Sequence, residues 1–326
     1  MFLAAANYFV PSTLLAIAAL GLNIQWGETG LFNAGVAAFV GIGAYTFGMF
    51  ATGLVPPTTI GGIPITPGHW GPPIPTDLLL SVLVAMAIPA LVGILIAIPT
   101  VRLRTDYLAI ATLAFAEIVR LVFKNEREFT GGDQNLNLIP RPFQWLVPPG
   151  PVSDILFLGI IMAILLGLLF FLNFLYRSPW GRSLKALRED EEAAEAIGKD
   201  TFMLKLGATG IGCAVMGLAG ALSASYAQTV GPDQFVPFYT FTVYVIVILG
   251  GSGNNRGVIV GAYLFYLFEW GAQEIQALPG IPGTASTTIV FGETIVIGLL
   301  LIFFILFRPA GIIPERKYIP PEPRKT

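Results

Sequence analysis

The chain has very few of the residues that form disulfides, metal sites and catalytic centres. Its 326 residues include one cysteine, Cys213, and one histidine, His69. A single cysteine excludes an intrachain disulfide. One histidine and scattered acidic residues give no ligand set for a metal and no paired carboxylates for an enzyme. We therefore expect no catalytic residues, no metal site and no cofactor, and we expect His69 to be an ordinary loop side chain.

Charged residues are also scarce. The chain has 18 Lys and Arg residues and 20 Asp and Glu residues, and its net charge at pH 7 is −2. About a quarter of the residues in soluble domains are charged, whereas the charged fraction here is 12%. This composition excludes an ordinary soluble domain, and it provides no bulk positive charge for binding nucleic acid.

Long apolar runs take the place of the missing charges. Hydrophobic residues make up 55% of the chain, and the run 155–176 has no charged residue. About 20 apolar residues in a helix cross a hydrocarbon core about 30 Å thick. We expect an all-α integral membrane protein, in which residues 1–326 form a single transmembrane domain built as a polytopic helical bundle.

Nine apolar segments predict nine membrane helices. They lie at 8–26, 31–53, 78–100, 105–123, 155–176, 203–227, 237–251, 258–276 and 287–307. The segment 237–251 is shorter than the roughly 20 residues that a straight span needs. It predicts either a crossing that gains length from 231–236 or a broken, re-entrant helix.

The distribution of Lys and Arg predicts the orientation, because cytoplasmic loops of membrane proteins are enriched in these residues. We place the polar loop 177–200 in the cytoplasm and count nine crossings. Only Lys124, Arg127 and Arg141 then lie in outer loops and Arg120 within a helix, so 14 of the 18 are cytoplasmic. Without a crossing at 237–251, the excess of Lys and Arg in the cytoplasmic loops would disappear. The charge rule thus favours that crossing and a cytoplasmic C-terminus.

The polar loop 177–200 has the sequence RSPWGRSLKALREDEEAAEAIGKD and holds 11 charged residues. Ser178 is suited to cap a helix, Pro179 to its first turn, and Gly198 to the position after its last turn. A helical wheel places Asp190 on an otherwise apolar half, so one helix or two short ones fit the pattern. That half holds Leu184, Ala186, Leu187, Ala193, Ala194 and Ile197.

The end of this loop resembles a motif of ABC importer permeases. The string E-A-A-x-x-x-G, from Glu192 to Gly198, is similar to their EAA loop, although the Ile-x-Leu-Pro that often follows is missing. In that family the loop is a coupling helix that docks on a cytoplasmic ATPase subunit. The resemblance implies a coupling role for Leu184, Leu187, Glu192, Ala193, Ala194 and Gly198. A solvated loop that only orients two helices is the plainer interpretation.

Four further stretches resemble the LivM-type permeases of branched-chain amino acid ABC importers. They are 20–49, 102–132, 217–235 and 249–265, so the resemblance covers almost the whole chain. It implies a type II-like fold, a second permease subunit, two ATP-binding subunits and an extracytoplasmic substrate-binding protein, in a bacterial inner membrane. Val36 stands where many relatives carry His, so no role of that His transfers.

Two other functions compete with this one. The same importer class could carry urea or short amides, and a chain of this composition could also be an ion-coupled secondary transporter. The chain has no G-x-x-x-x-G-K-[ST] phosphate-binding loop, and the Gly-rich 250–257 lacks the strand and the Lys-Ser/Thr of that motif. ATP hydrolysis would therefore belong to partner subunits.

Acidic and basic residues inside apolar segments are candidates for a transport pathway or for locking helices together. Glu117 and Arg120 lie three residues apart and can pair on one helix face. Glu269 and Glu293 are weaker candidates, because neither has a basic neighbour in sequence.

Small residues recur at four-residue spacing, which predicts close helix packing rather than a direct role in transport. They are Ala37 and Gly41 in one segment and Cys213, Gly217, Ala221 and Ser225 in another.

Overall fold

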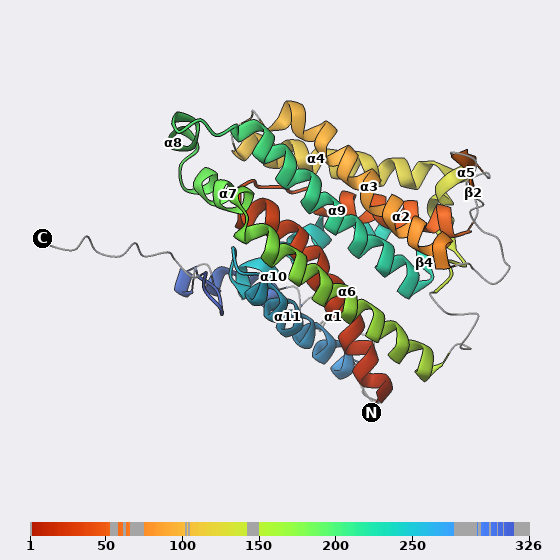
Figure 1. The fold of residues 1–326 in the computed structure, drawn as a ribbon. Helices are drawn as coiled ribbons and strands as arrows, with labels where there is room; N and C mark the ends of the chain where they lie inside the picture. The colour runs from red at the N-terminus through yellow and green to blue at the C-terminus, as the bar shows by residue number, and fades with distance from the viewer. Residues whose placement is uncertain are drawn as a thin grey trace, which may run out of the picture.

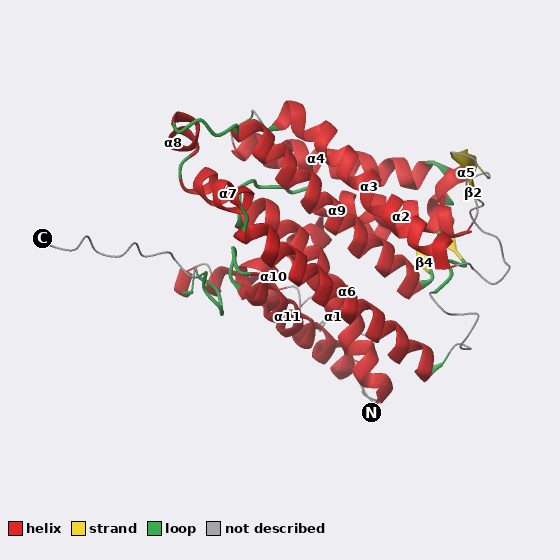
Figure 2. Ribbon diagram, viewed as in Figure 1, coloured by secondary structure: helices red, strands yellow, loops and turns green. Residues whose placement is uncertain are grey.

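The computed structural model describes residues 2–52, 58–60, 63–65, 75–101, 103, 105–141, 150–276, 292, 295–299, 301–304, 306–308 and 310–315. Most of these residues are helical, and the helices lie side by side in one bundle (Figure 1, Figure 2). His69 and Glu293 lie outside the described residues.

The first half of the chain contributes α1 (Phe2–Leu22), which continues into the π-helix η1 (Asn23–Gly27), and then α2 (Val36–Thr52), α3 (Pro75–Thr100) and α4 (Thr105–Asn125). The short strands β1 (Thr58–Ile60) and β2 (Ile63–Ile65) form an antiparallel pair between α2 and α3. After α4 come α5 (Arg127–Thr130), the 3-10 helix η2 (Gly132–Gln134) and β3 (Leu136–Asn137).

The second half contributes the long helices α6 (Pro151–Arg177) and α9 (Thr201–Ala227), with α7 (Pro179–Glu189) and α8 (Glu191–Ala196) between them. Strand β4 (Thr229–Val230), the 3-10 helix η3 (Pro232–Phe235), α10 (Pro237–Gly250) and α11 (Asn255–Gln276) follow. Strand β4 pairs with β3 in antiparallel orientation. The described residues in 295–299, 301–304 and 306–307 are also helical.

Each of the nine predicted segments therefore coincides with helix, the last one in its described part. Among the described residues, four helices are long and apolar enough to cross a membrane unbroken: Tyr8–Gly27, Leu78–Thr100, Val152–Arg177 and Thr201–Ala227. Helix α1 is largely buried, whereas α3 and α6 expose most of their apolar surface. The exposed apolar faces of α3 and α6 suit contact with lipid, so the architecture is that of a polytopic helical membrane protein.

The bundle has two ends that we name by nearby elements. At the α7 end, η1 meets the turn that joins α10 to α11, where the Gly253 amide donates to the Asn23 Oδ1 at 2.9 Å. At the β4 end, the Arg141 guanidinium binds the Tyr226 carbonyl oxygen at 2.7 Å and the Asp154 carboxylate at 2.8 Å. Helix α9 runs from the first end to the second.

Helix α10 is a short helix that ends in a sharp bend. Its 14 residues span about 21 Å, less than a membrane core. The chain leaves β4 at one end of the bundle, passes through η3 and reaches the α7 end through α10, and the axes of α10 and α11 differ by 119°. This path agrees with a crossing that gains length from 231–236, and the sharp bend with α11 also fits a broken or re-entrant helix.

Helix α2 is the counterpart of α10 and runs the opposite way. It begins only at Val36, not at residue 31, because 28–35 is an irregular segment that starts at the α7 end. The N-terminal turns of α2 and α10 meet inside the bundle. There the Thr240 hydroxyl of α10 accepts a hydrogen bond from the Ala37 amide of α2 at 3.0 Å. The Tyr244 hydroxyl donates to the Asn33 carbonyl oxygen at 3.1 Å. Such irregular backbone at membrane depth is tolerated because protein surrounds it.

Small residues allow α9 to approach its neighbours closely, as the sequence predicts. A Cβ on Gly43 of α2 would lie 2.3 Å from the Gly217 carbonyl oxygen, and one on Gly217 would lie 2.4 Å from the Ala85 carbonyl oxygen of α3. Both distances are shorter than any real contact. The backbones of α2, α3 and α9 therefore pack at a separation that only glycine permits.

Candidate functional site

Helix α7 forms where the polar loop leaves α6. The Ser178 hydroxyl caps it by accepting from the Gly181 amide at 3.4 Å, and Pro179 occupies its first turn. Both features confirm the sequence prediction. A Cβ on Gly181 would lie 2.4 Å from the Tyr176 Cα, so α7 turns back tightly against the end of α6. Leu184 and Leu187 are buried in the core of this chain.

Two short helices meet at Asp190, which decides between the alternatives left open by the sequence. Asp190 has an extended backbone, with φ −158° and ψ 110°, and ends α7. Its carboxylate also caps α8 by accepting from the Ala193 amide at 3.0 Å. Helix α8 ends at Ala196, and Gly198 follows in the turn with a φ of +80°, which favours glycine.

Helix α8 projects from the end of the bundle (Figure 1). Ala194 faces the chain and is buried. Glu192, Ala193 and Gly198 are exposed, and Ile197 is 70% exposed. The outward surface of α8 is therefore different from the apolar half that the helical wheel indicates, because Leu184, Leu187 and Ala194 face the bundle.

Two polar contacts tie α8 to α9. The Lys205 ammonium pairs with the Glu191 carboxylate at 2.5 Å, and the Thr201 hydroxyl donates to the Glu195 carboxylate at 2.5 Å. Asp200 caps α9 by accepting from the Met203 amide at 3.0 Å. Helix α8 is thus connected to the first turns of α9.

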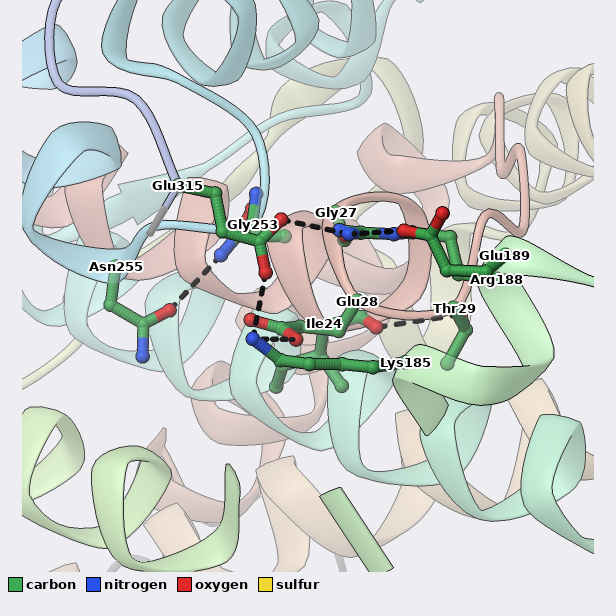
Figure 3. A network of polar contacts seen from close by, with 11 residues as sticks. Ile24, Gly27, Glu28, Thr29, Lys185, Arg188, Glu189, Gly253, Asn255 and Glu315 are labelled. Carbon is green, nitrogen blue, oxygen red and sulfur yellow. Dashed lines mark hydrogen bonds and ion pairs between the residues drawn. The ribbon is translucent and has the colours of Figure 1, made fainter. Parts of the chain in front are cut away.

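A network of charges connects α7 to three distant parts of the chain (Figure 3). Glu315, near the C-terminus, accepts from Lys185 at 2.7 Å and from Arg188 at 2.8 Å. The Arg188 guanidinium also donates to the Gly27 carbonyl oxygen at the end of η1. Lys185 and Arg188 therefore pair with residues far away in the sequence, in place of the i,i+4 pairing with Glu189 and Glu192 that helix spacing favours.

Glu28 is the buried member of this network. It is 1% exposed, and its carboxylate lies 3.8 Å from the Lys185 ammonium. Burial raises the pKa of Glu28 to about 7, against the lowering effect of Lys185 and Arg188. Burial alone would also raise the pKa of Glu315, but hydrogen bonds from Lys185 and Arg188 outweigh it and hold that pKa below its ordinary value.

The segment that carries Glu315 is fixed to the α10–α11 turn. The Ile312 amide donates to the Leu249 carbonyl oxygen at 2.9 Å, and the Ile313 amide to the Gly250 carbonyl oxygen at 3.1 Å. The Asn254 side chain donates to the Ile313 carbonyl oxygen at 3.3 Å. Residues 310–315 thus connect α7 to the C-terminal end of α10.

Glu117 and Arg120 form the pair that the sequence predicts. The Arg120 guanidinium binds the Glu117 carboxylate through Nη2 at 2.5 Å and Nε at 3.0 Å. It also lies 3.8 Å from the Asp233 carboxylate of η3. The ion pair of Arg120 with Glu117 therefore lies within α4, and the longer contact of Arg120 with Asp233 joins α4 to η3.

The remaining acidic candidate on described residues, Glu269, lies elsewhere. It is half-buried on α11, near the aromatic rings of Tyr8, Tyr266 and Trp270. Helices α4 and α11 lie at opposite edges of the bundle in Figure 1. The structure therefore does not bring Glu269 together with Glu117 and Arg120. No cluster of His, Cys, Asp and Glu able to hold a metal occurs within the described residues.

Sequence reasoning missed Glu28, Asp233 and Glu315. A signal existed for Glu28, since it is the only acid between residues 1 and 76. No local pattern pointed to Asp233 or Glu315, because their partners are more than 100 residues away in the sequence.

Comparisons with known proteins agree with this architecture. A family model described as the permease component of the branched-chain amino acid transport system matches residues 4–306. The chain is 33% identical, over 91% of its length and 67% of the relative's, to the high-affinity branched-chain amino acid transport system permease protein LivM of Salmonella typhimurium. It is 28% identical to a probable LivM of Methanocaldococcus jannaschii, over 96% and 94% of the two chains.

A more distant relative is named for a different substrate. The nucleoside ABC transporter permease protein NupC of Lactococcus lactis is 24% identical, over 92% of this chain and 91% of the relative. No solved structure matches the chain. The chain belongs to the branched-chain amino acid permease family of ABC transporters, whose members are non-catalytic membrane subunits.

Proposed function

We propose that this chain is one of two permease subunits of an ATP-driven importer that carries branched-chain amino acids across a bacterial inner membrane by alternating access. The observation that carries the proposal is the exposed surface of α8, which two polar contacts tie to α9 and which follows directly on α7. ABC permeases of this family work with ATP-binding subunits and a substrate-binding protein. In our proposal the α7 end and the C-terminus are cytoplasmic, as the Lys and Arg distribution favours.

Coupling would start at residues 177–200 and most directly at α8. Glu192, Ala193, Ile197 and Gly198 present a small, open surface suited to a cleft in an ATP-binding subunit. Movement of α8 reaches α9 through the pair of Lys205 and Glu191. Movement of α7, where Leu184 and Leu187 supply the buried packing, reaches η1 and the α10–α11 turn through Arg188 and Glu315. Packed elements of this kind convert a local displacement into rigid-body motion.

A second permease subunit is proposed on the basis of α4. The side chain of Asp233 beside it is 83% exposed on this chain alone. Charged side chains at membrane depth face protein or a water-filled cavity rather than lipid. A second permease of similar fold on this face would place protein beside Asp233 and enclose a water-filled cavity between the two subunits.

Branched-chain amino acids are the preferred cargo because the relatives named LivM are 28% to 33% identical to this chain, whereas the nucleoside permease NupC is 24% identical. The measurement that decides is the ligand bound by the partner substrate-binding protein. We expect leucine, isoleucine or valine. A nucleoside, urea or a short amide in that protein would overturn the cargo assignment and leave the importer assignment intact.

The coupling proposal is tested by Ile197→Asp in the complete transporter. A carboxylate on the exposed face of α8 would have to be desolvated on docking, so we expect loss of the ATP-binding subunits during purification and loss of uptake. The matched control is Leu138→Asp, the same substitution at a leucine that is 74% exposed at the β4 end.

Both variants change a solvent-facing side chain, so neither should impair insertion or folding of the chain. Leu138→Asp should retain the ATP-binding subunits and their ATPase activity. Retention of the ATP-binding subunits and normal uptake by Ile197→Asp would contradict docking through α8.

A further inference from the structure

One side of α4 carries charges that its own chain covers only in part: the side chains of Glu117 and Lys124 are 39% and 41% exposed, and that of Arg120 is 18% exposed. Leu108, Thr112 and Ala116 are buried against the bundle. Glu117, Arg120 and Lys124 lie on another stripe of the helix, at three- and four-residue spacing, and this stripe faces η3, which supplies Asp233. Apolar side chains that suit lipid, among them Ile118 and Val122, are exposed on a third stripe.

The charges on this stripe lie below the end of the helix. Arg120 is five residues from Asn125, the last residue of α4, which is about 8 Å along the axis, and Glu117 is about 12 Å from it. The Glu117 side chain is 39% exposed. If α4 crosses the membrane as the sequence predicts, lipid tails cannot solvate these groups, and this face needs water or a partner protein beside it.

The cluster of Glu117, Arg120 and Asp233 is incomplete in charge and in hydrogen bonds. It contains two carboxylates and one guanidinium. Arg120 uses Nε and Nη2 for Glu117, whereas its Nη1 has only the 3.8 Å contact with Asp233 among the described residues. A ligand with one ammonium and one carboxylate leaves this net charge of −1 unchanged, but its ammonium is a donor for the Asp233 carboxylate and its carboxylate is an acceptor for Nη1.

A buried hydroxyl lies behind the cluster. The Tyr45 ring packs 4.2 Å from the ring of Phe123 and 6.2 Å from that of Phe235, which flank Arg120 and Asp233 in sequence. Tyr45 is fully buried, and within the described part of the chain its Oη has no hydrogen-bond partner. A buried donor without a partner is costly unless a water or ligand satisfies it.

We propose that Glu117, Arg120 and Asp233 bind the charged ends of a zwitterionic α-amino acid where this chain meets the second permease. Arg120 Nη1 receives the ligand carboxylate, and the carboxylates of Glu117 and Asp233 receive its ammonium. Phe238 and Phe241, exposed on the first turns of α10 after η3, provide apolar surface for a branched side chain. This site rests on the proposed function, because it requires an amino acid as cargo.

The test is direct binding of leucine to the complete membrane complex in nanodiscs, without the substrate-binding protein. We expect isothermal titration to detect leucine. Leucinamide lacks the carboxylate and 4-methylpentanoate lacks the ammonium, so each should bind at least about 10-fold more weakly. Arg120→Gln and Asp233→Asn should each weaken leucine binding at least about 10-fold, and Tyr45→Phe should weaken it severalfold.

The matched control is Lys124→Gln, which removes a charge from the same stripe of α4 and should leave leucine affinity unchanged. The double variant Glu117→Arg with Arg120→Glu separates binding from helix locking. A purely structural pair would be restored by this exchange, whereas a ligand site would stay defective.

Unchanged leucine affinity in Arg120→Gln and Asp233→Asn would overturn the site, and so would failure of the unaltered complex to bind leucine. Either result together with normal ATP-driven leucine uptake would leave the proposed function standing. A substrate-binding protein loaded with a nucleoside would instead refute the cargo and the site together.

Discussion

Two charged clusters in this protein are each built around one arginine, yet they differ in what surrounds them. Arg188 lies among segments from four parts of the chain: η1, α7, the α10–α11 turn and the C-terminal residues 310–315. Arg120 binds mainly a carboxylate on its own helix, and its other partner, Asp233, is largely exposed. The two arginine side chains are similarly covered, at 24% exposed for Arg188 and 18% for Arg120, so the clusters differ in their acids. The side chains of Glu28 and Glu315 are 2% and 20% exposed, whereas those of Glu117 and Asp233 are 39% and 83% exposed. For this reason we call the first cluster enclosed and the second open.

This difference in the exposure of the acids indicates different roles for the two clusters. Breaking an ion pair that joins several segments leaves uncompensated charge inside the protein. An open cluster keeps donors and acceptors available to a molecule from outside. The Arg188 cluster therefore suits the transmission of movement, and the Arg120 cluster suits binding.

The largest effect is expected from Arg188→Met. It leaves the Gly27 carbonyl oxygen and one oxygen of Glu315 without their donor, so we expect a loss of about 2 to 3 kcal/mol in the free energy of unfolding together with loss of ATP-driven uptake. Thermal unfolding in detergent and uptake in proteoliposomes measure the two effects. Arg182→Met, at an exposed arginine of the same helix, is the control and should change neither. If Arg188→Met and Arg182→Met had the same stability and the same uptake, the contrast between the Arg188 and Arg120 clusters would be contradicted.

A pH effect of intermediate size is expected from Glu28. Its pKa is about 7 in the folded protein against an ordinary value of 4.5, so the folded state binds more protons than the unfolded state between these values. Stability should therefore fall as pH rises from about 4.5 to 7, by up to about 3 kcal/mol from this group. Glu28→Gln should remove this loss, which a series of unfolding temperatures from pH 5 to pH 8 will show.

Glu315→Gln is the opposite control for Glu28. The pKa of Glu315 is lowered in the folded protein, so its carboxylate stabilises the fold above the ordinary carboxyl pKa and loses that effect on acidification. The Gln variant should be less stable than the unaltered protein at pH 7. The same pH profile for Glu28→Gln and the unaltered protein would contradict the enclosed character of the cluster.

The smallest effect is expected from Glu191→Gln, at an ion pair that is open to solvent on its acidic side. Exposed pairs contribute about 0.2 to 1 kcal/mol, so the unfolding temperature should hardly move. ATPase stimulation by substrate should nevertheless fall, because α8 loses a contact with α9. Glu192→Gln, at a neighbouring exposed acid without that contact among the described residues, is the control for stability.

The sequence predicted the elements better than the contacts between them. Ser178 and Gly198 act locally, so their residue types predicted the start of α7 and the turn after α8, whereas the break between the two helices at Asp190 was left open. The inward orientation of Leu184 and Leu187 could not be predicted, because a helical wheel finds an apolar face but not the partner that covers it. The pairing of Lys185 with Glu28 and Glu315 depends on tertiary contacts over 157 and 130 residues. The bend after α10 is held by the C-terminal residues Ile312 and Ile313 as well as by the glycines of the turn.

The joint at Asp190 has a mechanical consequence. Because its backbone is extended and Gly198 is left-handed, α8 is attached at both ends through residues that belong to no helix. A change of a few backbone dihedral angles at these two points can rotate α8 as a rigid body about 9 Å long. Such a rotation leaves the helical hydrogen bonds within α7 and α9 intact and loads α9 only through the contacts of Glu191 with Lys205 and of Glu195 with Thr201. Helix α8 can therefore follow a moving partner while the helices on either side keep their length and register.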